Sequence, residues 1–259
     1  MHKLLKPLLL MSLVSGAACA QTPPPLINPV GSNVPDPAVD QALDALDARG
    51  KNLDDFTGEV VMRMTDSLGS DTQQMGKVWF QRLPNGDTRI RVSFDRKKLS
   101  KKEFKQRIEY KLEDGKLIDQ NHDTKLQVTR QVLKPGQKLD PLKLGEGPFP
   151  LPIGQDRAEV LKNFTVQKIA PAKDDPAGTI HLTLTPRAGT RFARKFSSID
   201  VFIGKDNFPV RIETIDRDGT TVRTTDLSNI KINTGLKGSD FTLPEPGKDW
   251  GVRDEALGE

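Results

Sequence analysis

Apolar and polar side chains alternate along most of this chain, and this period of two constrains its fold more than any other feature. In one run, Ile90, Val92 and Phe94 alternate with Arg91 and Ser93. Successive side chains of a β-strand point to opposite faces, so such a run predicts a strand with one apolar and one polar face. Strands of this kind are typical of an antiparallel sheet that is wetted on one side. Eleven segments have this character: 56–65, 75–82, 88–95, 107–112, 116–120, 126–133, 164–169, 179–185, 197–203, 210–216 and 221–232.

Turn signals separate several of these segments. Asn85-Gly86, Asp114-Gly115, Asp206-Asn207 and Asp218-Gly219 favour tight hairpins, because these residue types tolerate positive φ angles. Eleven strands joined in succession would curl into a barrel or a strongly curved sheet. Only 35% of the 259 residues are hydrophobic, and with 21 Gly and 19 Pro this composition argues against a helical bundle. The sequence therefore predicts a mainly β fold.

Two short helices are expected beside the strands. The first has a cap and first-turn signal at Asp36-Pro37 and a stop signal at Gly50. Its apolar residues recur at three-to-four spacing: Val39, Leu43 and Leu46. The second helix is expected at 157–162.

Two stretches interrupt the alternation of the strands. The run 96–107 contains five lysines, and we interpret it as a solvated insertion that is able to form a helix. The alternative is a contact for acidic headgroups or for an acidic partner. The stretch 139–164 is apolar but rich in proline, which lacks the donor of a sheet ladder and so excludes a central strand. We expect this stretch to lie across another part of the molecule as a cover.

The first twenty residues have the pattern of a bacterial secretory signal peptide. A basic start with Lys3 and Lys6 precedes an apolar run, and small residues close the segment. Ala18-Cys19-Ala20 favours cleavage before Gln21 and release into the periplasm, whereas the alternative is a lipoprotein anchored through Cys19. The expected organisation is a signal peptide at 1–20, a proline-rich linker or tail at 21–37, and a single domain at 38–259.

Charge and motifs exclude several classes of function. Two of the 39 basic residues lie in the signal segment, so the remaining 37 nearly balance the 35 acidic residues. The chain therefore lacks the excess of positive charge that is typical of proteins that bind nucleic acid. The single cysteine excludes a disulfide framework and a cysteine-based metal cluster. His122 and His181 are expected to be surface or structural residues. Because motifs for nucleotide binding, metal binding and hydrolysis are missing, we expect no catalytic residues, no cofactor and no metal site.

The apolar face of so large a sheet needs a cover. Two short helices and one proline-rich stretch are little cover for that many strands, so we hypothesise an apolar cavity suited to acyl chains. Methionine side chains adapt to irregular apolar ligands. The alternative is that all these residues belong to an ordinary core. The predicted cavity residues are Met62, Met64, Val78, Phe80, Ile90, Val92 and Phe94.

Short motifs along the chain resemble a known family. Residues 64–69 and 74–84 resemble the first hairpin of LolA, the periplasmic carrier of outer-membrane lipoproteins, in which a glycine, an aromatic pair and an Arg-Pro close the second strand. Asp114-Gly115-Lys116 stands where that family has a D-G-K hairpin. The resemblance runs from about Leu43 to Val252. Its motifs in the C-terminal half are 182–186, 196–204, 210–213, Asp218-Gly219, Asn229 and 240–244.

The resemblance implies an unclosed, strongly curved antiparallel half-barrel with a small helical lid over an apolar cavity. In that family the cavity takes lipoprotein acyl chains from an inner-membrane ABC transporter and passes them to an outer-membrane receptor. The arginine that ends the second strand there contacts the lid, so Arg82 is the expected lid latch. Leu83 separates Arg82 from the proline, which departs from the family pattern. The alternative for Arg82 is a strand-end arginine in solvent.

These inferences together predict a periplasmic, monomeric carrier that is not an enzyme. It would bind lipid or lipoprotein acyl chains for transfer toward the outer membrane, with an ABC transporter and an outer-membrane receptor as its partners. The alternative is an envelope sensor or scaffold of the same fold that binds a protein segment.

Overall fold

The computed structural model describes residues 36–133 and 156–256, all within a unit that spans Pro35–Glu259. Two α-helices, α1 (Pro37–Lys51) and α2 (Arg157–Asn163), and two 3₁₀ turns, η1 (Lys205–Asn207) and η2 (Gly238–Phe241), accompany the strands. The strands are β1 (Asp55–Thr65), β2 (Asp71–Arg82), β3 (Thr88–Leu99), β4 (Lys102–Glu113), β5 (Lys116–Asn121), β6 (Leu126–Gln131), β7 (Phe164–Ile169), β8 (Ile180–Pro186), β9 (Phe196–Ile203), β10 (Pro209–Asp216), β11 (Val222–Ile232) and β12 (Gly251–Glu255).

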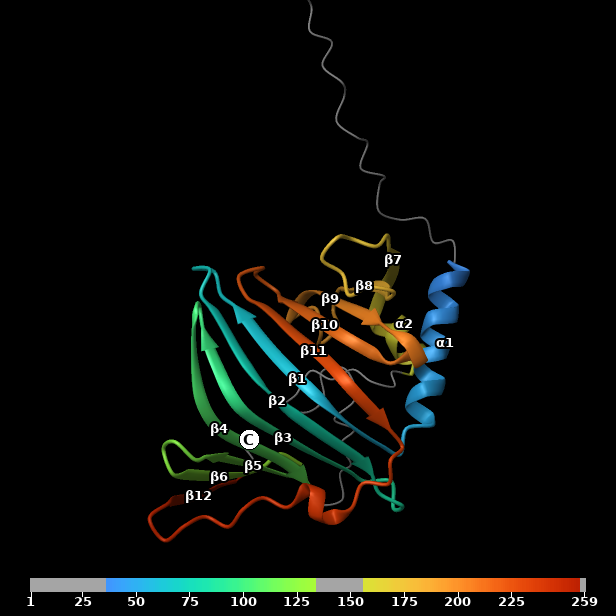
Figure 1. The fold of residues 1–259 in the computed structure, drawn as a ribbon. Helices are drawn as coiled ribbons and strands as arrows, with labels where there is room; N and C mark the ends of the chain where they lie inside the picture. The colour runs from blue at the N-terminus through green and yellow to red at the C-terminus, as the bar shows by residue number, and fades with distance from the viewer. Residues whose placement is uncertain (1–35, 134–155, 257–259) are drawn as a thin grey trace, which may run out of the picture. The chain divides into compact units, whose positions relative to one another are not determined.

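The twelve strands form one curved sheet in the order β12-β6-β5-β4-β3-β2-β1-β11-β10-β9-β8-β7 (Figure 1). Neighbours are antiparallel, except that β12 runs parallel to β6. The strands at the two ends of this order, β12 and β7, do not pair with each other, so the sheet stays unclosed. The expected mainly β, unclosed, strongly curved half-barrel with a small helical part is confirmed.

All eleven predicted strands are present, with ends that differ by a few residues. The predicted hairpin turns also form. Asp114 and Gly115 have φ angles of 53° and 71°, and positive φ at both central residues is typical of a type I′ turn. The twelfth strand, β12, was not predicted, because its residues are exposed on both faces and show no apolar alternation.

The prediction of a helix-forming insertion at 96–107 is wrong. This segment is exposed, as expected, but it forms the outer ends of β3 and β4 and the turn between them, where Ser100 has a φ of 52°. Lys97 pairs with Gln74 of β2 on one side and with Phe104 of β4 on the other. Two neighbouring ladders thus satisfy the backbone groups of this stretch, and that outweighs the low strand propensity of lysine.

Helix α1 begins as the sequence predicts. The Asp36 side chain accepts a hydrogen bond of 2.9 Å from the Ala38 amide, and Pro37 is the first helical residue. The helix buries its apolar stripe against one face of the sheet, which we call the inner face. The cluster that α1 and α2 form with this face contains Val39, Ala42, Leu43, Leu46, Val160, Phe164, Leu182, Leu184, Phe192, Ile199, Val201, Ile203 and Ile212.

The C-terminal segment (residues 233–256) packs on the opposite, outer face of β2 to β6. Three side chains of that face donate hydrogen bonds to its carbonyls: Gln81 to Leu236 at 2.7 Å, Arg91 to Asp240 at 3.0 Å and Gln120 to Pro244 at 2.8 Å. Phe241, which belongs to this segment, is fully buried, and the Arg89 guanidinium lies 4.5 Å from the centre of its ring. This outer cover was not foreseen from the sequence.

Several predictions fall on residues that the structure does not describe. The expected signal peptide at 1–20, the proline-rich stretch as far as residue 35, and residues 139–155 of the expected cover lie outside the described residues. Among residues 36–133 and 156–256, no helix has the length and apolar character needed to cross a membrane.

Candidate functional site

Five of the seven predicted cavity residues lie together, deeply buried, on the inner face. Val78 pairs with Val92 and Phe80 pairs with Ile90 across β2 and β3, and Phe94 lies opposite Gly76. All five of the apolar side chains in these pairs are at most 2% exposed. Alternate side chains of a strand point to the same face, so the sequence alone predicts that these five residues share one face of the sheet.

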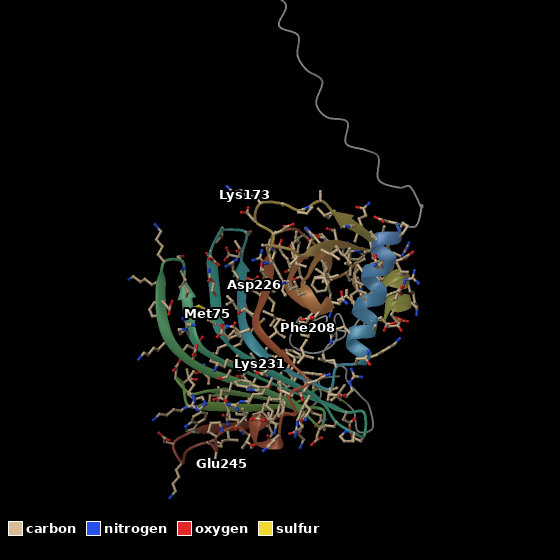
Figure 2. The ribbon with its side chains drawn as sticks, turned by 45° about the vertical axis from the view of Figure 1, so that its right-hand side comes forward. Met75, Lys173, Phe208, Asp226, Lys231 and Glu245 are labelled. Carbon is tan, nitrogen blue, oxygen red and sulfur yellow. The ribbon has the colours of Figure 1, made fainter. Side chains whose placement is uncertain are left out.

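These residues belong to a cluster that we call the apolar strip. Phe56 of β1 stacks on Phe80, with ring centres 5.6 Å apart, and Phe208 (labelled in Figure 2) meets Phe56 edge-on at 5.3 Å. Among the described residues, no α-helix contributes to the buried part of this strip. Its buried members are Leu53, Phe56, Val60, Val78, Phe80, Ile90, Val92, Phe94, Leu112, Leu117, Phe208 and Leu227. Helices α1 and α2 instead pack on the inner face of the strands β7 to β10.

The apolar strip continues to an exposed end of the sheet. Along β1, Phe56 and Val60 are buried, Met62 is partly buried, and Met64 is 42% exposed. Leu99 of β3 (42% exposed) and Phe104 of β4 (46%) lie at the same end. Neither Leu99 nor Phe104 was predicted to belong to the cavity, because both stand among the lysines of 96–107.

Polar side chains interrupt the strip near its exposed end. Gln74 and Lys97 lie side by side on the inner face, and Nε2 of Gln74 lies 3.3 Å from Oε1 of Gln106. These groups mark a change from a buried apolar interior to a rim that carries both apolar and polar side chains.

Arg82 ends β2 on the inner face, as predicted. Its Nη2 donates a hydrogen bond of 3.3 Å to the carbonyl oxygen of Gly50 in the last turn of α1. Its backbone amide donates to the Asp54 carbonyl at 2.7 Å, so the strand end and the helix exit are joined twice. The Nε of Arg82 is buried and has no hydrogen-bond partner within the described part of the chain. Arg82 thus joins the end of β2 to the last turn of α1, and its role as a lid latch stays a prediction.

Helix α1 has further polar attachments at both ends. Near its C-terminus, Nε of Arg49 donates to the Asp206 carbonyl at 2.6 Å. Near its N-terminus, Arg157 of α2 pairs with Asp40 at 2.5 Å and with Asp44 at 3.4 Å. These pairs are one-third or more exposed to solvent, where ion pairs add little stability, so most of the attachment of α1 comes from its buried stripe.

His181 lies between two carboxylates on the outer face. Its Nε2 is 3.0 Å from Asp200 and its Nδ1 is 3.3 Å from Asp175, while the Thr183 hydroxyl also donates to Asp200. The ring stacks on Phe202 with centres 4.1 Å apart. Both ring nitrogens of His181 thus face carboxylates. The arrangement fastens the connection between β7 and β8 to the sheet, which suits the structural role predicted for this histidine.

His122 belongs to a second polar cluster of the outer face. Its ring meets Trp250 of the C-terminal segment edge-on at 4.9 Å, and its Nε2 is 3.8 Å from Glu109. Burial and the neighbouring Arg107 charge lower the pKa of His122, and the Glu109 charge opposes them. Glu109 itself is buried and pairs with Arg91 at 2.7 Å and with Arg107 at 3.2 Å. This cluster holds the C-terminal segment in place.

Surface hollows on the described residues include the following two. One, of about 570 Å³, is lined by Lys195, Phe196, Asp216, Arg217, Asp218 and Arg223. The other, of about 300 Å³, is lined by residues of β4, β5 and β6 and by 242–246 of the C-terminal segment. Neither is lined by the predicted cavity residues, and the mixed charges of the first do not suit an acyl chain. No group of three or more histidine, cysteine or carboxylate side chains suited to a metal occurs on residues 36–133 and 156–256.

Comparisons with known proteins show likeness at the level of the fold. No family model matches the sequence, and a search of curated proteins finds no match. Among solved structures, MucB aligns with a TM-score of 0.48 and 13% identity, over 81% of this chain and 64% of that one. The lipoprotein LppX of Mycobacterium tuberculosis aligns with a TM-score of 0.45 and 15% identity, over 78% and 99%. A putative outer-membrane lipoprotein-sorting protein domain of Vibrio parahaemolyticus gives 0.36 and 12%, over 78% and 95%. This chain thus spans less than two thirds of the length of MucB.

Proposed function

We propose that this chain is an extracytoplasmic carrier, not an enzyme, that binds lipid or lipoprotein acyl chains on the inner face of its sheet. The observation that supports the proposal is the apolar strip, which runs from a fully buried cluster to an exposed end. The outermost side chains of an ordinary core are buried. This strip instead continues through the partly buried Met62 to the exposed side chains of Met64, Leu99 and Phe104. Fold alone does not determine a ligand, so the proposal depends on these side chains.

The length of the strip suits an acyl chain. From Phe56 to Met64 the strand advances eight residues at about 3.3 Å each, which is roughly 26 Å. A bilayer core of about 30 Å holds two leaflets, so one acyl chain needs roughly 15 Å. Each buried CH₂ contributes about 0.8 kcal/mol, so even partial insertion would hold a lipid firmly.

The lid and the transfer partners belong to the same proposal. Helix α1 would act as the lid, with Arg82 as its latch through the Gly50 carbonyl. Opening would uncover the inner face of β7 to β10 beside the apolar strip, and transfer would follow an affinity gradient to the next protein. The LolA resemblance indicates an inner-membrane ABC transporter as donor and an outer-membrane receptor as acceptor.

Binding of a fluorescent fatty acid, together with mass spectrometry of lipid extracted from the purified chain, tests the proposal. Met62→Glu places a charge on the partly buried inner face and should weaken binding by about tenfold or more, since a carboxylate is costly beside an acyl chain. Met75→Glu is the matched control, because Met75 (Figure 2) lies on the adjacent strand and points to the outer face. No co-purifying acyl lipid and no saturable binding, or equal losses in the two variants, would contradict it.

A second candidate is the sensor or scaffold that binds a protein segment. The observation that favours it is β12, an exposed end strand of the sheet that pairs on one side with β6. An extended peptide can add to such an edge through backbone hydrogen bonds. Deletion of residues 251–259 should abolish peptide capture by this route and leave fatty-acid binding unchanged, which separates the two candidates.

A further inference from the structure

Exposed apolar side chains gather at one end of the sheet. Six large apolar residues of the described chain are exposed, and four of them lie on the neighbouring β1–β2 and β3–β4 hairpins: Met64, Leu68, Leu99 and Phe104. Leu68, in the β1–β2 turn, is 89% exposed. The two turns lie side by side, since the Ser100 amide donates to the Asp71 carbonyl at 2.9 Å and Thr72 pairs with Leu99 (Figure 1). We call this end the hairpin tips.

The hairpin tips are strongly basic. Residues 95–107 carry seven lysine and arginine side chains against two carboxylates. Arg96 pairs with both of these carboxylates, Asp95 at 3.4 Å and Glu103 at 3.6 Å, and Arg107 pairs with Glu109. Within the described residues, no ion pair involves the five lysines of this stretch, namely Lys97, Lys98, Lys101, Lys102 and Lys105. Lys101, Lys102 and Lys105 are exposed, and Lys97 and Lys98 are partly buried.

The tips are also held in fixed geometry. The Asp66 carboxylate accepts hydrogen bonds of 2.9 Å from the Leu68 and Ser70 amides, and the Gly69 amide donates to the Asp66 carbonyl at 2.9 Å. Leu68 therefore projects from an ordered turn. Leu99 and Phe104 project from paired strands of β3 and β4.

We propose that the hairpin tips dock on the surface of an anionic lipid bilayer. Lysines attract the negative headgroups over about a Debye length, and the apolar side chains between them enter the boundary between headgroups and acyl chains. An acidic protein would account for the lysines but not for four exposed apolar side chains among them. The inference does not depend on acyl binding by the inner face, but it would bring the exposed end of the apolar strip to a membrane.

Flotation of the purified chain with vesicles tests the proposal. Phosphatidylcholine vesicles that contain phosphatidylglycerol should bind the chain, and pure phosphatidylcholine vesicles should bind it at least about tenfold less. Raising the salt from about 0.1 M to 1 M shortens the Debye length from roughly 10 Å to 3 Å and should weaken binding severalfold. Lys101→Glu/Lys102→Glu should lose binding by more than about tenfold.

Two further variants make the result specific. Phe104→Ser, a change at an exposed position, should weaken vesicle binding while the lysines stay in place, which a purely electrostatic contact would not show. Lys116→Glu/Lys168→Glu, with both lysines exposed and away from the tips, is the charge-matched control and should bind normally. The proposal is overturned if anionic vesicles do not bind, if tip and control variants lose binding equally, or if only an acidic polypeptide binds the lysines. Fatty-acid binding should be unchanged in Lys101→Glu/Lys102→Glu, so failure here and failure of the carrier proposal are distinguishable.

Discussion

Nη2 of Arg82 donates a hydrogen bond of 3.3 Å to the carbonyl oxygen of Gly50, in the last turn of α1. The last carbonyls of a helix lack partners within the helix, and they lie at the negative end of its dipole. An arginine at the end of a neighbouring strand is therefore a natural partner. The bond is long and Nε of the same side chain has no partner among the described residues, so this contact can be released without dismantling a larger network.

Arg82→Leu should slow the release of a bound fatty acid by about three- to tenfold. In the proposed mechanism, closure of α1 competes with the bound acyl chain. The variant loses the bond that favours closure and removes a charge from beside the apolar strip, so it favours the ligand-bound state. Stopped-flow measurement of the dissociation of a fluorescent fatty acid checks this. Arg82→Lys keeps the charge and should behave more nearly as the natural chain does. An unchanged dissociation rate in Arg82→Leu would count against the latch.

Glu109→Gln should destabilise the fold by roughly 2 to 3 kcal/mol. Glu109 is buried and accepts hydrogen bonds from both Arg91 and Arg107, so a neutral amide would leave Arg91 without its buried counter-charge. Urea denaturation measures the change. Glu103→Gln, at an exposed position of the hairpin tips, should change stability by less than about 0.5 kcal/mol. Equal effects of the two substitutions would show that the buried cluster is not an important source of stability.

His122 should make the fold less stable as the solution becomes mildly acidic. Its pKa in the folded chain lies below the ordinary value of 6.5, because burial and Arg107 oppose its protonation. The stabilisation from neutral His122 is therefore complete above about pH 6.5 and is lost as the pH falls, because the unfolded chain takes up the proton first. Melting temperatures at pH 7 and pH 5 should differ less in His122→Asn than in the natural chain. An identical difference would contradict this account.

The sequence predicts the sheet well where one face is buried and poorly where neither face is. The run Ile90, Val92 and Phe94 shows its strand through alternation, because one face of β3 is dry. Beyond Phe94 neither face of β3 and β4 is deeply buried, so the lysine-rich sequence shows no apolar alternation. Backbone pairing with the neighbouring strands forms these parts of β3 and β4 nonetheless. Strand β12 was missed for the same reason: backbone pairing with β6 and an ion pair between Arg130 and Glu255 hold it, not side-chain burial.

The site divides in a similar way. Because alternate side chains of a strand point to the same face, the sequence predicts that Val78, Phe80 and their neighbours share the inner face. The contact of Arg82 with the Gly50 carbonyl is present, and its role as a latch stays a prediction. The alternation of side chains along a strand cannot show which apolar residues remain exposed. Leu99 and Phe104 were therefore not recognised as exposed apolar residues of the inner face. Nor can the alternation bring together groups from distant segments, such as His181 with Asp175 and Asp200, because a loop outside the alternating pattern sets that arrangement.

Gly76→Ala should destabilise the fold, because the backbone of β3 leaves no room for a side chain at this position of β2. An ideal Cβ at Gly76 would lie 1.8 Å from the Ser93 carbonyl oxygen and 2.8 Å from the Cα of Phe94, so backbone would have to move. The register of β2 and β3 shifts at this point, and the shift changes how the strands continue from the buried strip to the hairpin tips. We expect a loss of about 1 to 3 kcal/mol by urea denaturation, together with weaker vesicle binding. Gly238→Ala is the matched control, since the nearest atom to its Cβ is 3.7 Å away, and its effect should be within about 0.5 kcal/mol. If Gly76→Ala proved as harmless as the control, the close packing at this bulge would not determine the course of the two hairpins.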